Sequence, residues 1–266
     1  NDFTTGEAIP GTESTSPNSM AMHWISNSTM LTTLTAKYDM NFGKHAINLL
    51  AGTSYEHYNY ERLYSKRTDF VSDGLEDIEQ GNEVSKETPG GSSIMESKML
   101  SYFGRVNYSW NDRYLLEVNV RADGSSRFYK DNRWGIFPSV SAGWRISEES
   151  FMKPVTWINN LKLRASYGTL GNINNVGYYD YFRLMSSGSN YNFSDTAVKG
   201  VVEAQIPNTS LGWETVALTD IGLDLDVLDN KLSISADYYI KNTSDILLGY
   251  NVPRETGIWS NPSLNL

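Results

Sequence analysis

Apolar and polar residues alternate along this chain, and this two-residue period constrains the fold more than any other feature of the sequence. The clearest stretch lies between residues 116 and 123. Its apolar residues are Leu116, Val118, Val120 and Ala122, and the residues between them are Glu117, Asn119, Arg121 and Asp123. Because successive side chains of a β-strand point to opposite faces, this pattern predicts a strand with one apolar and one polar face.

Seven further segments alternate in the same way, so the sequence predicts an all-β chain with about eight antiparallel strands. They are residues 30–38, 47–55, 102–108, 140–144, 161–167, 221–225 and 232–238. Each segment has charged or amidic residues on its polar side.

The connections between these segments alternate between short and long. Short links are predicted at residues 40–44, 110–113 and 228–230, and a modest link at 147–159 has room for a helical turn. Long polar stretches, rich in Gly, Ser, Asp and Asn, occupy roughly residues 66–93, 124–135 and 171–211. Outer-membrane β-barrels show this order, with short periplasmic turns and long extracellular loops.

Aromatic residues gather at or near the short connections. They are Tyr38, Phe42, Trp110, Tyr114, Trp144, Phe151 and Trp157. In a transmembrane barrel such residues form a ring at one membrane interface, where an amphipathic aromatic side chain is most stable. Their distribution therefore favours a membrane barrel.

A soluble β-sandwich that binds carbohydrate through Trp and Tyr platforms is the alternative, because it shows the same alternation turned inside out. Two features favour the membrane. Several segments alternate over the roughly 9–11 residues that a transmembrane strand needs. The apolar face is also rich in small residues, which would pack a dry core poorly: Ala51, Gly104, Ala122, Ala142, Ala165 and Ala236. A structural barrel without transport stays open as a third class.

Charge and residue types exclude several functions. The net charge of −9, without a basic cluster, argues against nucleic acid as a partner. The chain has no cysteine, its three histidines (His23, His45 and His57) are scattered, and no catalytic or nucleotide-binding motif is present, so we expect no metal, no cofactor and no enzymatic activity. The adjacent acids Glu148 and Glu149 are interpreted as solvated turn charges.

Three stretches resemble a known family. The first is Ser101–Met152, SYFGRVNYSWNDRYLLEVNVRADGSSRFYKDNRWGIFPSVSAGWRISEESFM. The others are Leu161–Asn172, LKLRASYGTLGN, and Trp213–Leu248, WETVALTDIGLDLDVLDNKLSISADYYIKNTSDILL. In this order they resemble the central barrel of the SusC/RagA-type TonB-linked (TonB-dependent) outer-membrane transporters of Bacteroidetes.

The resemblance implies a multi-pass outer-membrane barrel of about 22 strands with an N-terminal plug. It also implies import of oligosaccharides or peptides with energy delivered by the TonB complex through the plug, under a SusD-like surface lipoprotein. Residues 1–266 would then be a fragment of one barrel domain in contact with outer-membrane lipid, without the plug, the closing strands or a signal peptide.

The loop at residues 123–134 combines aromatic and cationic side chains. Its candidates for substrate binding are Arg127, Tyr129, Arg133 and Trp134, because aromatic rings stack on sugars or peptide side chains while arginines bind polar groups. A structural role is the alternative, in which Arg127 or Arg133 pairs with Asp123 or Asp131. A second aromatic group after Gly171 is predicted either to dock a lid protein or ligand or to hold its own loop folded: Tyr178, Tyr179, Tyr181, Phe182, Tyr191 and Phe193.

Charged residues on the polar sides of consecutive strands are predicted to face the lumen of the barrel. They are Arg105, Glu117, Arg121, Arg145, Lys162 and Arg164. They are expected either to meet acidic residues of a plug or to pair with acids of neighbouring strands, at about 0.2–1 kcal/mol for each pair. The sequence does not decide between these two roles.

Overall fold

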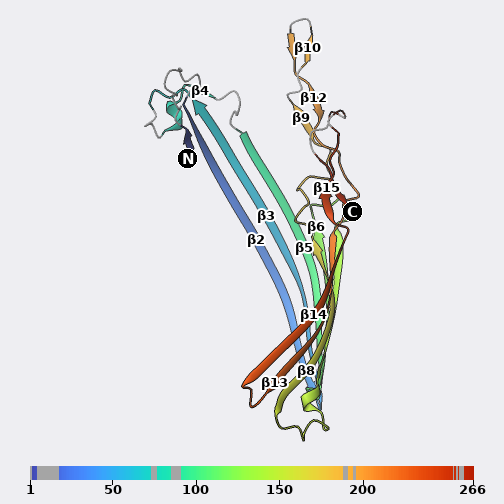
Figure 1. The fold of residues 1–266 in the computed structure, drawn as a ribbon. Helices are drawn as coiled ribbons and strands as arrows, with labels where there is room; N and C mark the ends of the chain where they lie inside the picture. The colour runs from blue at the N-terminus through green and yellow to red at the C-terminus, as the bar shows by residue number, and fades with distance from the viewer. Residues whose placement is uncertain are drawn as a thin grey trace. The chain divides into compact units, whose positions relative to one another are not determined.

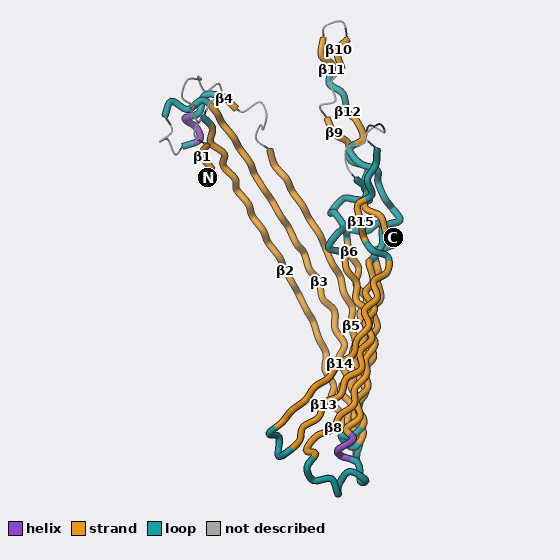
Figure 2. The backbone as a smooth tube through the Cα atoms, viewed as in Figure 1, coloured by secondary structure: helices purple, strands orange, loops and turns teal. Residues whose placement is uncertain are grey.

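The structure is a computed structural model that describes residues 2–4, 18–72, 77–84, 91–187, 191–193, 196–253, 255, 257 and 261–266. The chain divides into two units. One comprises Asn1–Met30 with His57–Ser97, and the other comprises Leu31–Glu56 with Lys98–Leu266. β-Strands make up most of the described residues (Figures 1 and 2).

Eight long strands form the main sheet. They are β2 (Ser19–Phe42), β3 (His45–Thr68), β5 (Gly91–Trp110), β6 (Tyr114–Ser125), β7 (Trp134–Arg145), β8 (Ile158–Asn172), β13 (Glu214–Val227) and β14 (Leu232–Ser244). The strand order is β1-β2-β3-β5-β6-β7-β8-β13-β14, in which β1 is the short strand Asp2–Thr4, and the short strand β4 (Glu83–Val84) pairs with β3. Each of the eight predicted segments lies within one of these strands, so the predicted all-β antiparallel fold is confirmed.

Strands β2 and β3 are longer than the sequence predicts. Each has 24 residues, whereas alternation predicted strands only at residues 30–38 and 47–55. Outside these segments both faces carry polar residues, which hides the period, yet the backbone pairing continues because it does not depend on side-chain polarity. A bilayer needs only about 9–11 residues of strand, so both strands exceed that length.

Short strands also occupy the termini and the loops that were predicted to be long. They are β1 (Asp2–Thr4), β4 (Glu83–Val84), β9 (Met185–Ser187), β10 (Tyr191–Phe193), β11 (Thr196–Val198), β12 (Val201–Glu203), β15 (Leu247–Gly249) and β16 (Ser263–Asn265). Pairing of β9 with β12 and of β10 with β11 gives the loop between β8 and β13 a ribbon structure. Such short strands carry too few residues for a period to be read from sequence.

The short connections adopt tight turns. Gly43 and Lys44 link β2 to β3, and Gly43 has φ of +60°. Asn111 (φ 51°) and Asp112 (φ 53°) adopt left-handed backbone between β5 and β6, a conformation that Asn and Asp tolerate better than most residues. The 3₁₀ helix η2 (Ile146–Glu148) follows β7 and overlaps the start of the connection at residues 147–159, which the sequence showed to have room for a helical turn. A second, η1 (Ile78–Gln80), lies in the loop after β3.

No helix among the residues that the structure describes is long and apolar enough to cross a membrane.

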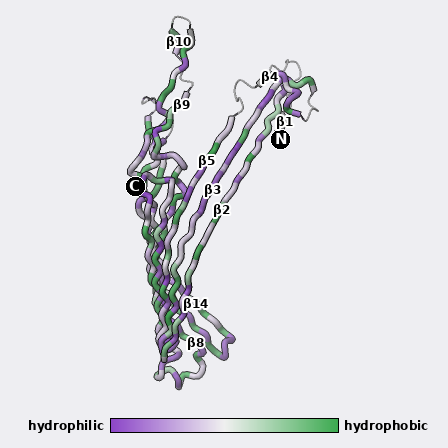
Figure 3. Tube along the Cα trace, turned by 180° about the vertical axis from the view of Figure 1, so that it is seen from behind, coloured by the Kyte–Doolittle hydropathy of each residue, from purple (hydrophilic) through white to green (hydrophobic). Residues whose placement is uncertain are grey.

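The register of the sheet separates the side chains into an apolar and a polar face. Val106, Val118 and Val140 lie opposite one another on β5, β6 and β7, and Tyr167 of β8 continues this row. Figure 3 shows hydrophobic and hydrophilic residues alternating along the strands. The apolar row is uncovered: Val118 at mid-strand is 38% exposed. A second sheet packed on this face, as in a sandwich, is absent from the described residues.

The main buried hydrophobic cluster of the described residues lies among the loops of the larger unit. Phe128, Val176, Leu211 and Leu247 are buried together, and Ile173 and Trp213 pack against them. We call these six residues the loop core. They come from the β6–β7 loop, the β8–β13 loop and the segment after β14, so three separate loops share one core.

Polar side chains fasten the same loops to the C-terminal residues. Asn265 Nδ2 donates to the carbonyl oxygens of Gly212 (3.1 Å) and Asp245 (2.9 Å), and its Oδ1 accepts from the Gly212 amide at 2.8 Å. The buried carboxylate of Glu214 accepts from Asn172 Nδ2 at 2.9 Å and from the Leu247 amide at 3.0 Å. These bonds satisfy backbone groups that the loop core would otherwise leave without partners.

Candidate functional site

The polar face of the sheet is the candidate site, because it gathers hydrogen-bonding side chains from consecutive strands. One row across the sheet consists of Asn107, Glu117, Ser141, Ser166 and Asp220, which lie directly opposite one another on β5, β6, β7, β8 and β13. Directly opposed residues share one face of a sheet. The row therefore gives five neighbouring strands a continuous polar surface.

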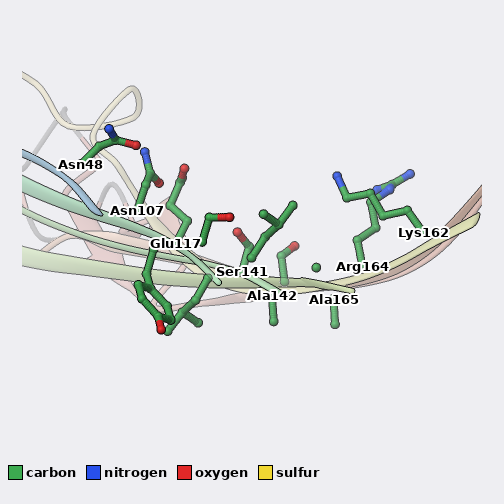
Figure 4. A pocket seen from close by; sticks show the side chains of 14 residues that line it. Asn48, Asn107, Glu117, Ser141, Ala142, Lys162, Arg164 and Ala165 are labelled. Atoms are coloured by element: carbon green, nitrogen blue, oxygen red, sulfur yellow. The ribbon is translucent and has the colours of Figure 1, made fainter. Parts of the chain in front are cut away.

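A shallow cavity of about 550 Å³ lies on this surface, between strands β3 and β8. Figure 4 shows Lys162 and Arg164 rising from one side of the strands, whereas Ala142 and Ala165 project from the other side. A second cavity, of about 570 Å³, adjoins it and shares Glu117, Ser141 and Ser166 with it.

Arg164 is the centre of an ion-pair network on this face. Its guanidinium lies 3.3 Å from Asp220 Oδ1, 3.2 Å from Asp224 Oδ2 and 2.5 Å from Asp237 Oδ1. The side chain extends from β8 over Gly222 of β13, where a Cβ atom would overlap the guanidinium carbon. Glycine at position 222 thus lets one arginine on β8 reach an acid on β14, two strands away.

The six charged residues predicted to face the lumen all lie on the polar face. Arg105 and Glu117 sit opposite Asn119 and Asn107 on neighbouring strands, and Arg145 sits opposite Lys162. Arg121 pairs with Asp123 of its own strand (Nε–Oδ1 2.7 Å), not with an acid across the sheet. Cross-strand ion pairs are formed by Arg164. That this face lines a lumen stays a prediction.

Two of the loop candidates hold the loops together. Arg127 Nη1 donates to the Val176 carbonyl at 3.2 Å, and its guanidinium carbon lies 4.2 Å from the centre of the Tyr178 ring. Arg133 Nε donates to the Phe128 carbonyl at 3.2 Å. Neither arginine forms the predicted ion pair with Asp123, because Asp123 pairs with Arg121 instead. Both arginines thus contact the loop core, and their binding role stays a prediction.

The structure does not place Tyr129 and Trp134 together. Tyr129 contacts the ring of Tyr181 edge-on, with centroids 6.1 Å apart, and Lys130 Nζ lies 5.8 Å from its ring. Trp134 is opposite Gly124 and stacks on Tyr102 (centroids 5.9 Å apart), so it lies on the apolar face, 49% exposed. This position favours a membrane-interface role for Trp134 over ligand binding.

Aromatic residues of the polar face were missed by the sequence reasoning. Phe103 on β5 and Phe137 on β7 lie directly opposite Arg121 on β6, so they share the polar face with it. Each ring lies over a glycine of an adjacent strand, Gly52 and Gly171 respectively, where a Cβ would clash with the ring. Glycine in a strand signals such close approach, so Gly52 and Gly171 were the available signal.

The belt of aromatic residues predicted near the short connections contains stacked pairs of side chains. Trp110 and Tyr114 have centroids 5.3 Å apart, and Tyr114 and Trp144 have centroids 6.3 Å apart. Tyr38, Phe42, Phe151 and Trp157 are all exposed. Such uncovered rings suit a membrane interface.

The interpretation of Glu149 as a solvated turn charge is wrong. Glu149 is only 9% exposed, whereas its neighbour Glu148 is exposed. Its Oε1 accepts from the Tyr114 hydroxyl at 2.7 Å and from Trp144 Nε1 at 3.2 Å, and Arg113 Nη1 lies 3.3 Å from Oε2. The turn folds the acid back onto the aromatic pair, which a single sequence does not reveal. The Tyr114 hydrogen bond, with smaller contributions from Trp144 and Arg113, lowers the pKa of Glu149.

We expect Glu149 to make the stability of the protein depend on pH. A lowered pKa in the folded state means that its contribution is complete above the unfolded-state pKa, about 4.3, and is lost as the pH falls through the folded-state value. Thermal unfolding of the full-length protein in detergent should therefore show a lower midpoint below about pH 4. The Glu149→Gln variant should lose this part of the pH dependence. Glu148→Gln is the matched control, and an unchanged pH profile in Glu149→Gln would contradict the assignment.

The described residues contain no group of three or more His, Asp or Glu side chains placed to hold a metal ion. The histidines lie apart from one another: His45 Nδ1 lies 2.7 Å from the Tyr108 hydroxyl and its ring stacks on Phe42, and His57 Nε2 lies 2.7 Å from Glu96 Oε1. In the β8–β13 loop, the rings of Tyr181 and Phe182 have centroids 4.3 Å apart, and the rings of Tyr191 and Phe193 have centroids 4.7 Å apart.

Comparison with known proteins gives one consistent family. Residues 1–262 match the family described as TonB dependent receptor-like, beta-barrel. A TonB-dependent receptor of Formosa agariphila is 36% identical over 230 residues, which cover 86% of this chain and 22% of that protein. SusC of Bacteroides thetaiotaomicron, a TonB-dependent receptor, is 37% identical over 171 residues, which cover 63% of this chain and 17% of SusC.

Solved structures show the same relationship. The structure of the RagAB peptide transporter superposes with a TM-score of 0.83 and 28% identity, over 93% of this chain and 27% of the compared chain. The RagAB peptide importer in its open-open state superposes with a TM-score of 0.80 and 27% identity. The chain thus spans about a fifth to a quarter of the length of the relatives that it matches.

Proposed function

Because the chain belongs to the family of TonB-dependent receptor-like β-barrels, we propose that residues 1–266 form part of the barrel wall of an outer-membrane nutrient importer. The observation that carries this proposal is the separation of the two faces. The apolar face of the sheet is uncovered and suits hydrocarbon, whereas the polar face gathers Asn, Ser, Arg and Asp side chains and suits a water-filled path.

The soluble β-sandwich is not favoured. A sandwich buries its apolar rows between two sheets, whereas Val118 and its neighbours on this sheet are exposed. The described residues also have too small a buried cluster to replace such a core, since the loop core involves only six residues of the loops. A barrel in lipid needs no core of that kind, because its apolar residues face the membrane.

The proposed cargo is an oligosaccharide or a peptide. SusC and RagAB are the relatives that support this range, and RagAB is described as a peptide transporter. Strand pairing, the loop core and the Asn265 bonds give the loops of this chain a defined structure, which suits a preformed binding surface. Arg127, Tyr129 and Arg133 lie at or beside the loop core and stay the candidates for contact with cargo, whereas Trp134 faces the other way.

The proposal extends to parts of the protein outside residues 1–266. We propose that a plug closes the barrel and couples it to TonB, that further strands complete the wall, and that a SusD-like lipoprotein covers the loops. The exposed rings of Tyr179, Phe182, Tyr191 and Phe193 are the proposed contact surface for that lipoprotein, since interfaces are enriched in aromatic residues. The protein is proposed to act without enzymatic chemistry.

Deletion of the gene in its own bacterium tests the function. The deletion strain should lose uptake of fluorescently labelled members of one class, either oligosaccharides from starch or peptides from a casein digest. The full-length gene should restore uptake, and a protonophore should abolish it, because import through TonB draws on the proton-motive force. Uptake that survives deletion in both classes would instead favour a structural barrel without transport, whereas uptake that needs the gene but resists the protonophore would favour a passive pore.

A further inference from the structure

An arginine without an acidic partner lies among aromatic rings on β2 and β3. In the unit formed by Asn1–Met30 and His57–Ser97, Arg62 Nη2 lies 3.0 Å from His23 Nδ1. The Arg62 guanidinium carbon is 5.8 Å from the centre of the Tyr64 ring, and the rings of His23 and Tyr64 have centroids 4.7 Å apart. These contacts place the three side chains on the same face of the strand pair.

Tyr60 belongs to the same group. It lies two residues before Arg62 on β3, so both side chains point to the same face of the strand. We call His23, Tyr60, Arg62 and Tyr64 the Arg62 cluster. Tyr60 and Tyr64 are half-buried, whereas His23 and Arg62 are exposed, so the charged end of the cluster is open to a ligand.

The charge of Arg62 is not neutralised by the described part of the chain. Four other arginines pair with acids: Arg113 with Glu149, Arg121 with Asp123, Arg164 with three aspartates and Arg183 with Glu203. No ion pair joins Arg62 to any acid among the described residues, and its polar partner is a ring nitrogen that accepts only when the imidazole is neutral at that atom. Five further arginines of the described residues also form no ion pair, namely Arg67, Arg105, Arg127, Arg133 and Arg145, so Arg62 is distinguished by its contacts with His23 and Tyr64.

From this geometry we infer that the Arg62 cluster binds a carboxylate of a solute. The planar guanidinium offers several N–H donors in a fork that matches the two oxygens of a carboxylate. Tyr64 lies beside the guanidinium and Tyr60 precedes it on the same face of β3, so both can offer an aromatic ring to a sugar ring or an apolar stem beside the acid. The proposal rests on the importer function only in taking that solute to be cargo.

Two kinds of solute carry this chemistry, namely acidic oligosaccharides and acidic peptides. The guanidinium contributes equally to both, because it contacts the carboxylate alone. The tyrosine rings distinguish the two solutes, since packing on Tyr60 favours the rigid C–H face of a sugar ring over a flexible glutamate side chain. Loss of the Tyr60 ring should consequently weaken the binding of acidic oligosaccharides more than the binding of acidic peptides.

Titration calorimetry of the purified full-length protein in detergent tests the inference. The acidic probes are tetragalacturonate and tetraglutamate, and the neutral probes are maltotetraose and tetraglutamine. The wild type should bind at least one acidic probe more tightly than its neutral counterpart. Arg62→Gln should weaken that binding by about tenfold or more, and the difference should shrink at high salt. If the solute is a saccharide, Tyr60→Leu should weaken the binding of tetragalacturonate and leave the binding of tetraglutamate unchanged.

Arg183→Gln is the matched control, because it removes an equal charge from an exposed arginine that already pairs with Glu203. Unchanged thermal unfolding of each variant shows that the barrel is intact. The inference is overturned if Arg62→Gln binds the acidic probes as the wild type does, or if neither acidic probe is preferred over its neutral counterpart. Binding needs no energy source, so a failure of uptake in cells would leave this result standing.

Discussion

Replacing Val118 with arginine is expected to destabilise the folded, membrane-inserted protein by about 2–4 kcal/mol. Val118 lies at the middle of β6, opposite Val106 on β5 and Val140 on β7, and all three are exposed on the apolar face. If this face contacts lipid, a guanidinium at position 118 must enter hydrocarbon or drag water and headgroups toward it. Either route raises the free energy of the folded state.

Asn119→Arg is the matched control, because it places the same charge one residue away on the polar face. Asn119 lies opposite Arg105 and Ser139, so the new side chain stays among polar groups. We expect it to change stability by less than about 1 kcal/mol. Both are measured by urea unfolding of the full-length protein in lipid vesicles. Equal effects of the two substitutions, or a larger effect at position 119, would show that the apolar face does not contact lipid.

Truncating Phe128 to alanine should have the largest effect in the loops, about 3–5 kcal/mol. Phe128 has 0% exposure, and its ring packs against Trp213 with centroids 5.3 Å apart. Trp213 in turn contacts Phe137 and donates its indole N–H to the Arg133 carbonyl at 3.0 Å. A cavity at position 128 therefore removes contacts from the loop core and from both ends of the β6–β7 loop.

The effect of Phe128→Ala should be confined to the loops, since the strands are held by backbone pairing. Hydrogen exchange should become faster in residues 173–187 and 204–213, while the paired amides of β6 and β7 keep their protection. Tyr191→Ala is the matched control, because its ring is 65% exposed on β10 and its loss should change stability little. Global unfolding in Phe128→Ala, or no change in loop exchange, would contradict the role of the loop core.

The sequence was sufficient for the long strands and for the family. Alternation identified every long strand because each has one apolar face, as at Leu116–Ala122. The resemblance to SusC/RagA-type transporters is confirmed by the family match and by the RagAB structures. The extensions of β2 and β3 were not predicted, because both faces of each carry polar residues, such as Ser26 and Asn27 on β2 and Asn59 and Arg62 on β3.

The site was less predictable than the fold, since its details depend on residues far apart in sequence. Arg164 was recognised as a polar-face residue, yet its network with Asp220, Asp224 and Asp237 depends on a glycine on another strand. The burial of Glu149 depends on how a turn folds back onto Tyr114. The aromatic and cationic residues of its loop make Trp134 a candidate for substrate binding, but only the strand register shows that its side chain lies on the apolar face.

The strand order has a consequence for how such a wall assembles. Every long strand pairs with the long strands before and after it in the chain, so each new strand can be added to a free edge as a hairpin in order of synthesis. Tight turns at residues 43–44, 111–113 and 228–231 make three of these steps local, with little loss of chain entropy. The step from β8 to β13 must instead bring together ends separated by residues 173–213, and it is the slowest of these additions on entropic grounds. Until β13 pairs with β8, one edge of β8 has unpaired backbone groups that can pair with a wrong strand.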